Sequence, residues 1–307
     1  MTPPHLPAAT ATPRAALTVR GLSKRYGKLQ ALQDLSFVVP AGSITGLVGP
    51  NGAGKTTTMS IVAGFLPPDA GEVDVLGLGP FDPARHRGVV GILPQDAELP
   101  PASTPRQLLT VWGRLGGLDG AAATRAVDEV LTAVHLLDRA DKRVGTLSHG
   151  MRRRVTVASA LLGDPAFVLL DEPTSGLDPA QARSLRDHLA TQRGRRTLLV
   201  SSHNLAEVES LCDHVVFIEG GRCTRSGPMW EITGRDREVH VILAPPFPPN
   251  RGERVVLHLA PTDPRAVEDA TSDLLRTLLA EGARIAEVRR GDTLENRYLG
   301  GAAMAGE

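Results

Sequence analysis

The sequence holds one glycine-rich loop, Gly49-Pro50-Asn51-Gly52-Ala53-Gly54-Lys55-Thr56, and it constrains the fold more than any other feature. It follows an apolar run, Ile44–Val48, and precedes a segment with helical spacing, Lys55–Phe65. The spacing fits G-x-x-x-x-G-K-[ST] in the strand–loop–helix context that this pattern requires. Glycines let backbone N–H groups converge on phosphates, and the helix N-terminus favours negative charge. The loop therefore predicts a phosphate-binding site within an α/β sheet.

Each side chain of the loop has an expected task. Lys55 reaches the terminal phosphates, and the Thr56 hydroxyl can ligate Mg²⁺. The residues expected to surround the nucleotide are Asn51, Gly52, Ala53, Gly54, Lys55, Thr56 and Thr57. Taken alone, a glycine-rich turn can match this pattern by chance, so its chemical partners must be found elsewhere in the chain.

Those partners are expected at the end of a second apolar run, Phe167–Leu170, which is followed by Asp171 and Glu172. Such a run is typical of a buried parallel strand. We expect this strand to lie beside the one that feeds the loop, so that the two sites converge. Asp171 would then hold Mg²⁺, and Glu172 would polarise the attacking water. The alternative is a pair of solvated acids that open a turn before Pro173.

The remaining pattern alternates strands with helices, which indicates an α/β sheet. A helical insert at about 100–160 is expected to form a side lobe. Residues 16–234 are predicted to be one domain, residues 1–15 a disordered tail rich in Pro, Ala and Thr, and residues 235–307 a small α+β extension.

Composition excludes several classes of protein. The 34 basic and 34 acidic residues balance, which argues against bulk attraction to nucleic acid. Two cysteines, Cys212 and Cys223, make neither a disulfide framework nor a metal site. A membrane span needs about 20 mainly apolar residues, and no window qualifies. If the protein acts at a membrane, another chain must span it.

From about residue 17 to 228 the chain resembles the nucleotide-binding subunit of an ATP-binding cassette (ABC) transporter. The glycine loop and Asp171–Glu172 are two of several motifs in the order of that family. The resemblance implies a P-loop ABC cassette with an antiparallel β subdomain and a helical lobe, and it implies ATP and Mg²⁺ as cofactors. It also implies that Tyr26 stacks on adenine, that Gln95 senses Mg²⁺ and the membrane partner, and that His203 contacts the γ-phosphate.

Two further segments match motifs that act across a dimer in this family. Ser175–Asp178 is similar to the loop that communicates between subunits, with Asp178 among the residues near the nucleotide. Leu147-Ser148-His149-Gly150-Met151 resembles the signature LSGGQ, in which Ser148 and Gly150 would complete the ATP site of the opposite subunit. The resemblance therefore implies two ATP molecules sandwiched in a two-fold dimer.

The signature departs from its family twice, at His149 in place of glycine and at Met151 in place of glutamine. Ser and Gln at this spacing form a capping box, so Met151 removes the bond to the Ser148 backbone while Ser148 still caps the helix. Met151 followed by Arg152–Arg154 is similar to the ATPases of drug-exporter-like ABC systems. We hypothesise that His149 adds positive charge near the phosphate at lower pH; the alternative is a tolerated surface side chain.

The expected function is ATP hydrolysis that drives a membrane transporter. The resemblance to the drug-exporter-like (ABC-2 type) group favours an exporter of a small molecule or drug-like compound. Glu172, His203 and Gln95 are the expected catalytic residues, and Thr56, Gln95 and Asp171 the expected metal ligands. The expected partners are a multi-span permease, docked near Gln95 and the helical lobe, and a second ATP-binding subunit that forms a homodimer with this one. No nucleic acid is expected. The expected location is the cytoplasmic face of the membrane.

The alternative is an ABC ATPase that acts on ribosomes or nucleic acid, although such chains usually carry two cassettes. The extension 235–307 is similar to that of the exporter group; it could brace the dimer, bind a regulator or be purely structural.

Overall fold

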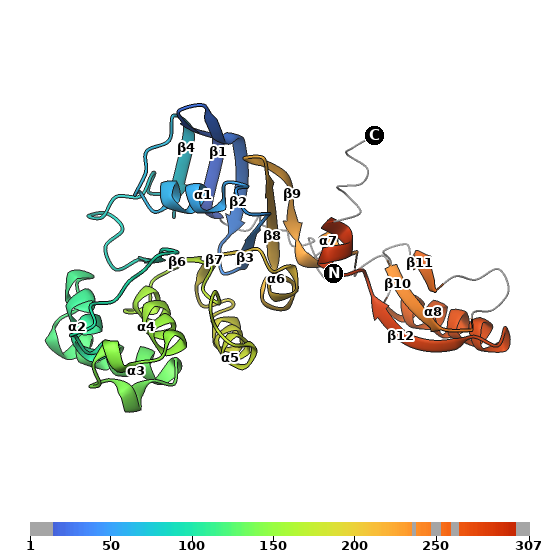
Figure 1. The fold of residues 1–307 in the computed structure, drawn as a ribbon. Helices are drawn as coiled ribbons and strands as arrows, with labels where there is room; N and C mark the ends of the chain where they lie inside the picture. Colours follow the sequence, from blue (N-terminus) through green and yellow to red (C-terminus); the bar gives the residue numbers. More distant parts are fainter. Residues whose placement is uncertain (1–14, 235–237, 247–252, 259–263, 299–307) are drawn as a thin grey trace, which may run out of the picture. The chain divides into compact units, whose positions relative to one another are not determined.

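The computed structural model describes residues 15–234, 238–246, 253–258 and 264–298. The chain forms two compact units (Figure 1). The first contains the residues up to His203 together with Val216–Thr224, and the second contains Asn204–Val215 together with the residues from Arg225. The predicted division into 16–234 and 235–307 stays a prediction, and the predicted tail falls almost wholly outside the described residues.

The first unit begins with an antiparallel sheet in the order β2-β1-β4, in which β1 and β2 are blue and β4 is teal in Figure 1. These strands are β1 (Ala15–Tyr26), β2 (Leu29–Pro40) and β4 (Ala70–Val75). Leu17, opposite Val39 and Val75, is fully buried. Alternating apolar residues cover one face, as expected for a sheet that packs on a core on one side. This is the expected antiparallel subdomain.

A second sheet has six strands in the order β5-β6-β7-β3-β8-β9. Its strands are β3 (Ile44–Val48), β5 (Val90–Leu93), β6 (Phe167–Asp171), β7 (Thr197–Ser202), β8 (His214–Glu219) and β9 (Arg222–Pro228). The pairs β5–β6, β6–β7 and β7–β3 are parallel. Every residue of β3, β6 and β7 is buried. Continuous apolar runs of this kind are typical of parallel strands covered on both faces.

One expectation about this sheet is wrong. The strand that ends at Asp171 does not lie beside the strand that feeds the glycine loop, because β7 is inserted between β6 and β3. Strand order depends on pairing between segments that are far apart in the chain. Strand β7 comes later in the chain and pairs with both β3 and β6, and the local sequence does not specify this pairing. Parallel strands end at the same edge of the sheet, so the loop after β3 and the acids after β6 still face the same edge.

Helices complete the first unit. The glycine loop leads into α1 (Lys55–Val62), which is shorter than the predicted helix. The side lobe holds α2 (Pro105–Leu115), α3 (Gly120–Ala133) and α4 (His149–Leu161), green in Figure 1. Its core contains Leu109, Val127, Leu131, Val155 and Ala158. The predicted helical lobe is therefore confirmed. Helix α5 (Pro179–Ala190) follows β6.

The second unit has a three-stranded antiparallel sheet in the order β11-β10-β12. The strands are β10 (Glu238–Ala244), β11 (Arg254–His258) and β12 (Arg284–Arg290). Helix α8 (Pro264–Ala280) supplies Leu278 to a core shared with Val239, Val241 and Leu243. The short helices α6 (Leu205–Leu211) and α7 (Met229–Thr233) belong to the same unit. The predicted α+β character of the extension is present in these elements.

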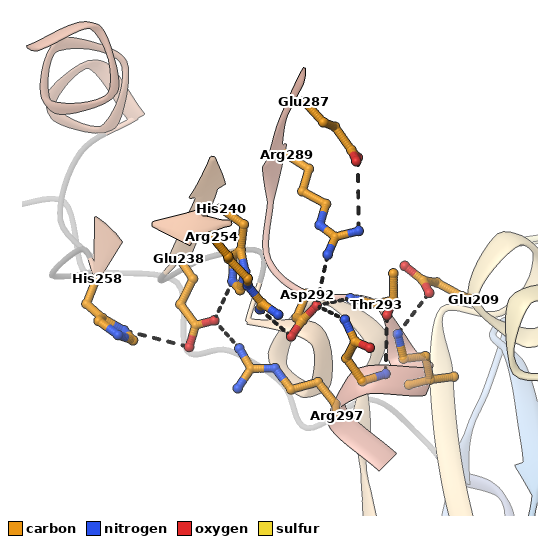
Figure 2. A network of polar contacts seen from close by, with 12 residues as sticks. Glu209, Glu238, His240, Arg254, His258, Glu287, Arg289, Asp292, Thr293 and Arg297 are labelled. Carbon is orange, nitrogen blue, oxygen red and sulfur yellow. Dashed lines mark hydrogen bonds and ion pairs between the residues drawn. The ribbon is translucent and has the colours of Figure 1, made fainter. Parts of the chain in front are cut away.

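A polar network lies within the second unit (Figure 2). Buried His240 donates from Nε2 to Glu238 Oε2 at 2.8 Å, and Arg254 Nε donates to His240 Nδ1 at 2.9 Å. Arg254 also pairs with Asp292, and Arg297 pairs with Glu238. The network joins strands β10 and β11 to the residues that follow β12. Its charges have partners on neighbouring elements, which is what burial of charged groups requires.

Asp292 gives this network a pH dependence. Burial raises the pKa of its carboxyl, but hydrogen bonds from Arg254, Asn296 and the Thr293 N–H outweigh burial and lower the pKa from 3.8 to about 2. A carboxyl with a depressed pKa in the folded state stabilises at pH values above its unfolded pKa, and that stability is lost as the pH falls through the folded pKa. The shift corresponds to about 2 kcal/mol of unfolding free energy.

We therefore expect the second unit to lose about 2 kcal/mol of stability between about pH 5 and pH 2, and Asp292→Asn to abolish most of that dependence. Urea unfolding at a series of pH values measures this loss of stability. Trp112 and Trp230 are the two tryptophans of the chain, so in a Trp112→Phe background the fluorescence reports on Trp230 alone. An unchanged pH dependence in Asp292→Asn would contradict the assignment.

Candidate functional site

The glycine loop needs its glycines for steric reasons that the structure shows directly. A Cβ on Gly49 would stand 2.1 Å from the Ile218 carbonyl oxygen. Gly54 has φ +107°, and a Cβ there would stand 2.6 Å from Leu32 Cδ2. A side chain at either position would therefore displace the loop. Gly52 also has a positive φ, +80°, which favours glycine.

Lys55 is the first residue of α1, and only 6% of the residue's surface is exposed. Its Nζ donates to the carbonyl oxygens of Gly49 at 2.7 Å and Pro50 at 3.1 Å. Burial lowers the pKa of the ammonium, whereas Glu172 and Asp171 act in the opposite direction. The predicted lysine thus lies inside its own loop with both predicted acids close enough to influence its charge.

The two acids at the end of β6 have different environments. Asp171 is 3% exposed and accepts a hydrogen bond from the Ser201 hydroxyl. Burial raises the pKa of Asp171, and the negative charge of Glu172 raises it further. Glu172 has φ +49°, an unusual conformation for a residue with a long side chain, and its N–H donates to Ser201 Oγ at 2.9 Å. Backbone strain of this kind often accompanies function.

Glu172 and His203 are brought together although 31 residues separate them. His203 Nδ1 lies 2.8 Å from Glu172 Oε2 and 2.9 Å from Oε1. The carboxylate accepts, so Nδ1 carries the proton and Nε2 is left for another partner. A hydrogen bond to a second group is the usual way to orient a general base. The predicted base and the predicted histidine therefore form a pair.

The three expected metal ligands line one cavity of about 170 Å³. The Thr56 hydroxyl donates to Gln95 Oε1 at 3.0 Å. A hydroxyl, an amide oxygen and a carboxylate are the hard oxygen donors that Mg²⁺ prefers. A cation there would also offset the burial of the Asp171 charge. The residues present therefore fit a Mg²⁺ ion.

The other predicted residues occupy separate places. Tyr26 ends β1 with 48% of its surface exposed, so its ring is available for stacking. Asp178 caps α5 by accepting from the Gln181 N–H at 2.9 Å. Ser148 caps α4 by accepting from the Met151 N–H at 3.2 Å. As expected, the Ser148 cap is made without the reciprocal bond of a capping box.

Sequence reasoning missed one residue of this site, Arg153. Its buried guanidinium donates to the carbonyl oxygens of Asp171 at 2.9 Å and Glu172 at 2.6 Å. It also donates to the carbonyl oxygens of Gln95 at 3.2 Å and Pro173 at 3.3 Å. One side chain of α4 thus fixes both the end of β6 and the segment that holds Gln95. The sequence could have indicated Arg153 by its position. It stands three residues after Gly150 on α4, away from the face that carries Val155 and Ala158 into the core of the side lobe.

We expect Arg153→Met to destabilise the first unit by about 3 kcal/mol, because hydrogen bonds from a charged donor contribute about 1.5–3 kcal/mol and buried carbonyl groups would be left unpaired. Thermal unfolding with and without ATP measures the loss. Arg154→Met is a control, since Arg154 Nη1 donates to the Val134 carbonyl oxygen in the side lobe and not to β6. Equal losses of stability and ATPase activity in the two variants would show that Arg153 has no special task.

Comparison with known proteins agrees with this geometry. The ABC transporter family model matches residues 32–175. The "Nod factor export ATP-binding protein I" of Burkholderia lata is 42% identical over 217 residues, which cover 70% of this chain and 71% of that protein. This chain belongs to the ABC transporter ATP-binding family. It is accordingly an ATP-binding and ATP-hydrolysing subunit of a membrane transporter, and the alternative of an ABC ATPase acting on ribosomes is not favoured.

Solved structures agree on the fold. One described as the ATP-binding subunit of an ABC transporter superposes with a TM-score of 0.64 at 30% identity, covering 71% of this chain and 91% of that one. Another, cbiO1 from Clostridium perfringens, is described as part of the ABC transporter complex cbiONQ. It superposes with a TM-score of 0.63 at 28% identity, covering 71% and 90%. The predicted fold class is therefore confirmed. Subunits of this family work with transmembrane permease partners, and the described residues of this ABC subunit include no helix long and apolar enough to cross a membrane.

Proposed function

We propose that this ABC subunit powers an exporter and hydrolyses ATP as a dimer. The proposal of ATP hydrolysis is supported mainly by the Glu172–His203 pair, which lies at the same edge of the sheet as Lys55 and Asp171. Lys55 and the loop N–H groups bind the phosphates. Glu172 takes the proton of the attacking water, and His203 Nδ1 holds its carboxylate in place. The remaining stabilisation is electrostatic, as is general for phosphoryl transfer.

The proposed metal is Mg²⁺, held by Thr56, Gln95 and Asp171. When bound, it would neutralise charge on the phosphates. The chain's own contribution is to keep three oxygen donors within one small cavity and to connect Gln95 to the acids through Arg153.

Export is proposed on two grounds. The relatives are named for Nod factor export, and Met151–Arg154 together with the C-terminal extension resembles the drug-exporter-like group. We propose a small molecule or drug-like compound as the cargo and a multi-span permease as the partner, docked near Gln95 and the side lobe. The subunit would lie at the cytoplasmic face of the membrane.

The dimer is proposed because the signature segment resembles one that completes the nucleotide site of an opposite subunit, and because its first residues are exposed. Ser148 is exposed at the N-terminus of α4, where backbone N–H groups and the helix dipole favour negative charge. In a two-fold dimer, Ser148 and Gly150 of one subunit would meet the ATP bound by the loop of the other. Tyr26 would stack on the adenine ring.

The proposal is tested by isolating the tagged chain from native membranes and identifying what accompanies it. A multi-span protein is expected, and ATP hydrolysis by that complex should rise when the exported compound is added. Strains that carry Glu172→Gln should accumulate the compound. Recovery with ribosomes and no membrane protein would contradict the proposal.

A further inference from the structure

The signature segment lies against the 175–178 loop of its own chain. His149 Nδ1 is 3.3 Å from the Gly176 carbonyl oxygen, so the ring nitrogen donates and the carbonyl accepts. The ring also packs over Gly176: a Cβ at residue 176 would stand 2.5 Å from His149 Cε1. Gly176 has φ +73°, which leaves room for the ring and suits glycine.

The contact is continued at the next residue. A Cβ on Gly150 would stand 1.9 Å from Gln181 Oε1, so the first turn of α4 packs closely on the first turn of α5. The Gln181 N–H is in turn bonded to Asp178, at the end of the loop. Farther along α4, Arg153 holds the carbonyl oxygens that precede the loop. Three positions of α4 therefore contact one continuous stretch, Asp171–Gln181.

His149 is the exposed member of these three positions, and it is a position where the segment departs from LSGGQ. The LSGGQ signature that the segment resembles has glycine here, which has no side chain to reach the loop. Both contacting segments resemble motifs that face the opposite subunit. A side chain that joins them would limit their motion relative to each other.

We propose that His149 is a positioning residue: it ties the signature segment to the 175–178 loop of the same chain, so that both segments are presented to the partner subunit's nucleotide as one unit. The consequence for hydrolysis rests on the proposed dimer, whereas the tie itself is a property of the single chain. The two can therefore be tested separately.

The tie is tested by hydrogen–deuterium exchange of full-length wild type and His149→Ala. We expect backbone amides of residues 174–178 to exchange about fivefold faster in His149→Ala, the factor that corresponds to one ordinary hydrogen bond. His149→Asn should restore slow exchange, because Asn Nδ2 is as many bonds from Cα as His Nδ1. His135→Asn, at an exposed histidine of the side lobe, should leave these amides unchanged. Equal exchange in wild type and His149→Ala would overturn the proposal.

A double-mutant cycle tests the packing. In the wild-type background, Gly176→Ala must displace the His149 ring and also strain the backbone. In the His149→Ala background only the backbone strain remains, so Gly176→Ala should then lower the unfolding temperature by less. Additive effects would show that ring and loop do not interact and would overturn the proposal.

ATPase kinetics of the same variants test whether the contact made by His149 affects hydrolysis. We expect His149→Ala to lower kcat about fivefold with KM for ATP nearly unchanged, because the nucleotide is bound mainly by the loop of the other subunit. His149→Asn should recover kcat. Faster exchange with unchanged kcat would overturn the positioning role, while the proposed dimer would remain supported if mixed subunits complement each other. Failure of complementation would instead remove the dimer and leave the tie standing.

Discussion

Glu172→Gln is expected to bind ATP as tightly as wild type and to hydrolyse it about 10²–10⁴-fold more slowly, since a positioned general base contributes a factor of that size. The amide has nearly the shape of the carboxylate and can still accept from His203 Nδ1, but it cannot take a proton from water. ATP affinity measured by equilibrium dialysis, combined with the rate of phosphate release, separates the two effects.

The same variant should also accumulate as an ATP-bound dimer, because hydrolysis is the step proposed to reopen it. Gel filtration with ATP and Mg²⁺ measures that shift. Glu129→Gln, at an exposed position on α3, is the matched control and should behave as wild type. Normal turnover in Glu172→Gln would contradict the assigned base.

Lys55→Met has the second largest expected effect. Methionine can fill the buried space of the side chain, but it removes the ammonium that donates to Gly49 and Pro50 and is proposed to donate to phosphate. Loss of one charged donor costs about 1.5–3 kcal/mol, or about 10–100-fold in the ATP dissociation constant. The hydrolysis rate should fall by a further factor of about 10²–10³, because a preorganised donor is lost from the transition state.

Equilibrium dialysis and single-turnover hydrolysis measure the two losses in Lys55→Met. Lys142→Met changes an exposed lysine of the side lobe and should have neither effect. The unfolding temperature of Lys55→Met is the control. If it fell so far that unfolding of the protein accounted for the lost activity, Lys55 would be a structural residue of the loop and its catalytic assignment would be wrong.

Local sequence patterns were sufficient for the elements that build this site. The strand–loop–helix around Gly49–Thr56, the buried strand that ends at Asp171 and the helical lobe all follow from apolar periodicity and turn residues. Strand order did not follow, because the position of β7 between β6 and β3 depends on pairing between segments far apart in the chain. Even so, the convergence of the two motifs was correctly expected, since parallel strands share an edge.

Side-chain connections were harder to predict than motifs. Arg153 stands within a run of three arginines, and only the orientation of α4 decides which of them reaches the carbonyl oxygens after β6. Likewise, the signature pattern placed His149 near a phosphate of another subunit, whereas the structure shows its ring against Gly176 of the same chain. The hypothesis that His149 adds charge at low pH stays a prediction, and identical pH profiles for wild type and His149→Gly would refute it.

The central claim is that the loop of one subunit is completed by the signature of another, and mixing two inactive variants tests it most directly. Lys55→Met disables the loop, and Ser148→Arg places a large side chain on the exposed end of α4. In a mixed dimer, one site combines both defects and the other has an intact loop and an intact signature. The account predicts that the mixture recovers ATPase activity, about a quarter of wild type if subunits pair at random and sites act independently. A mixture as inactive as each variant alone would contradict it.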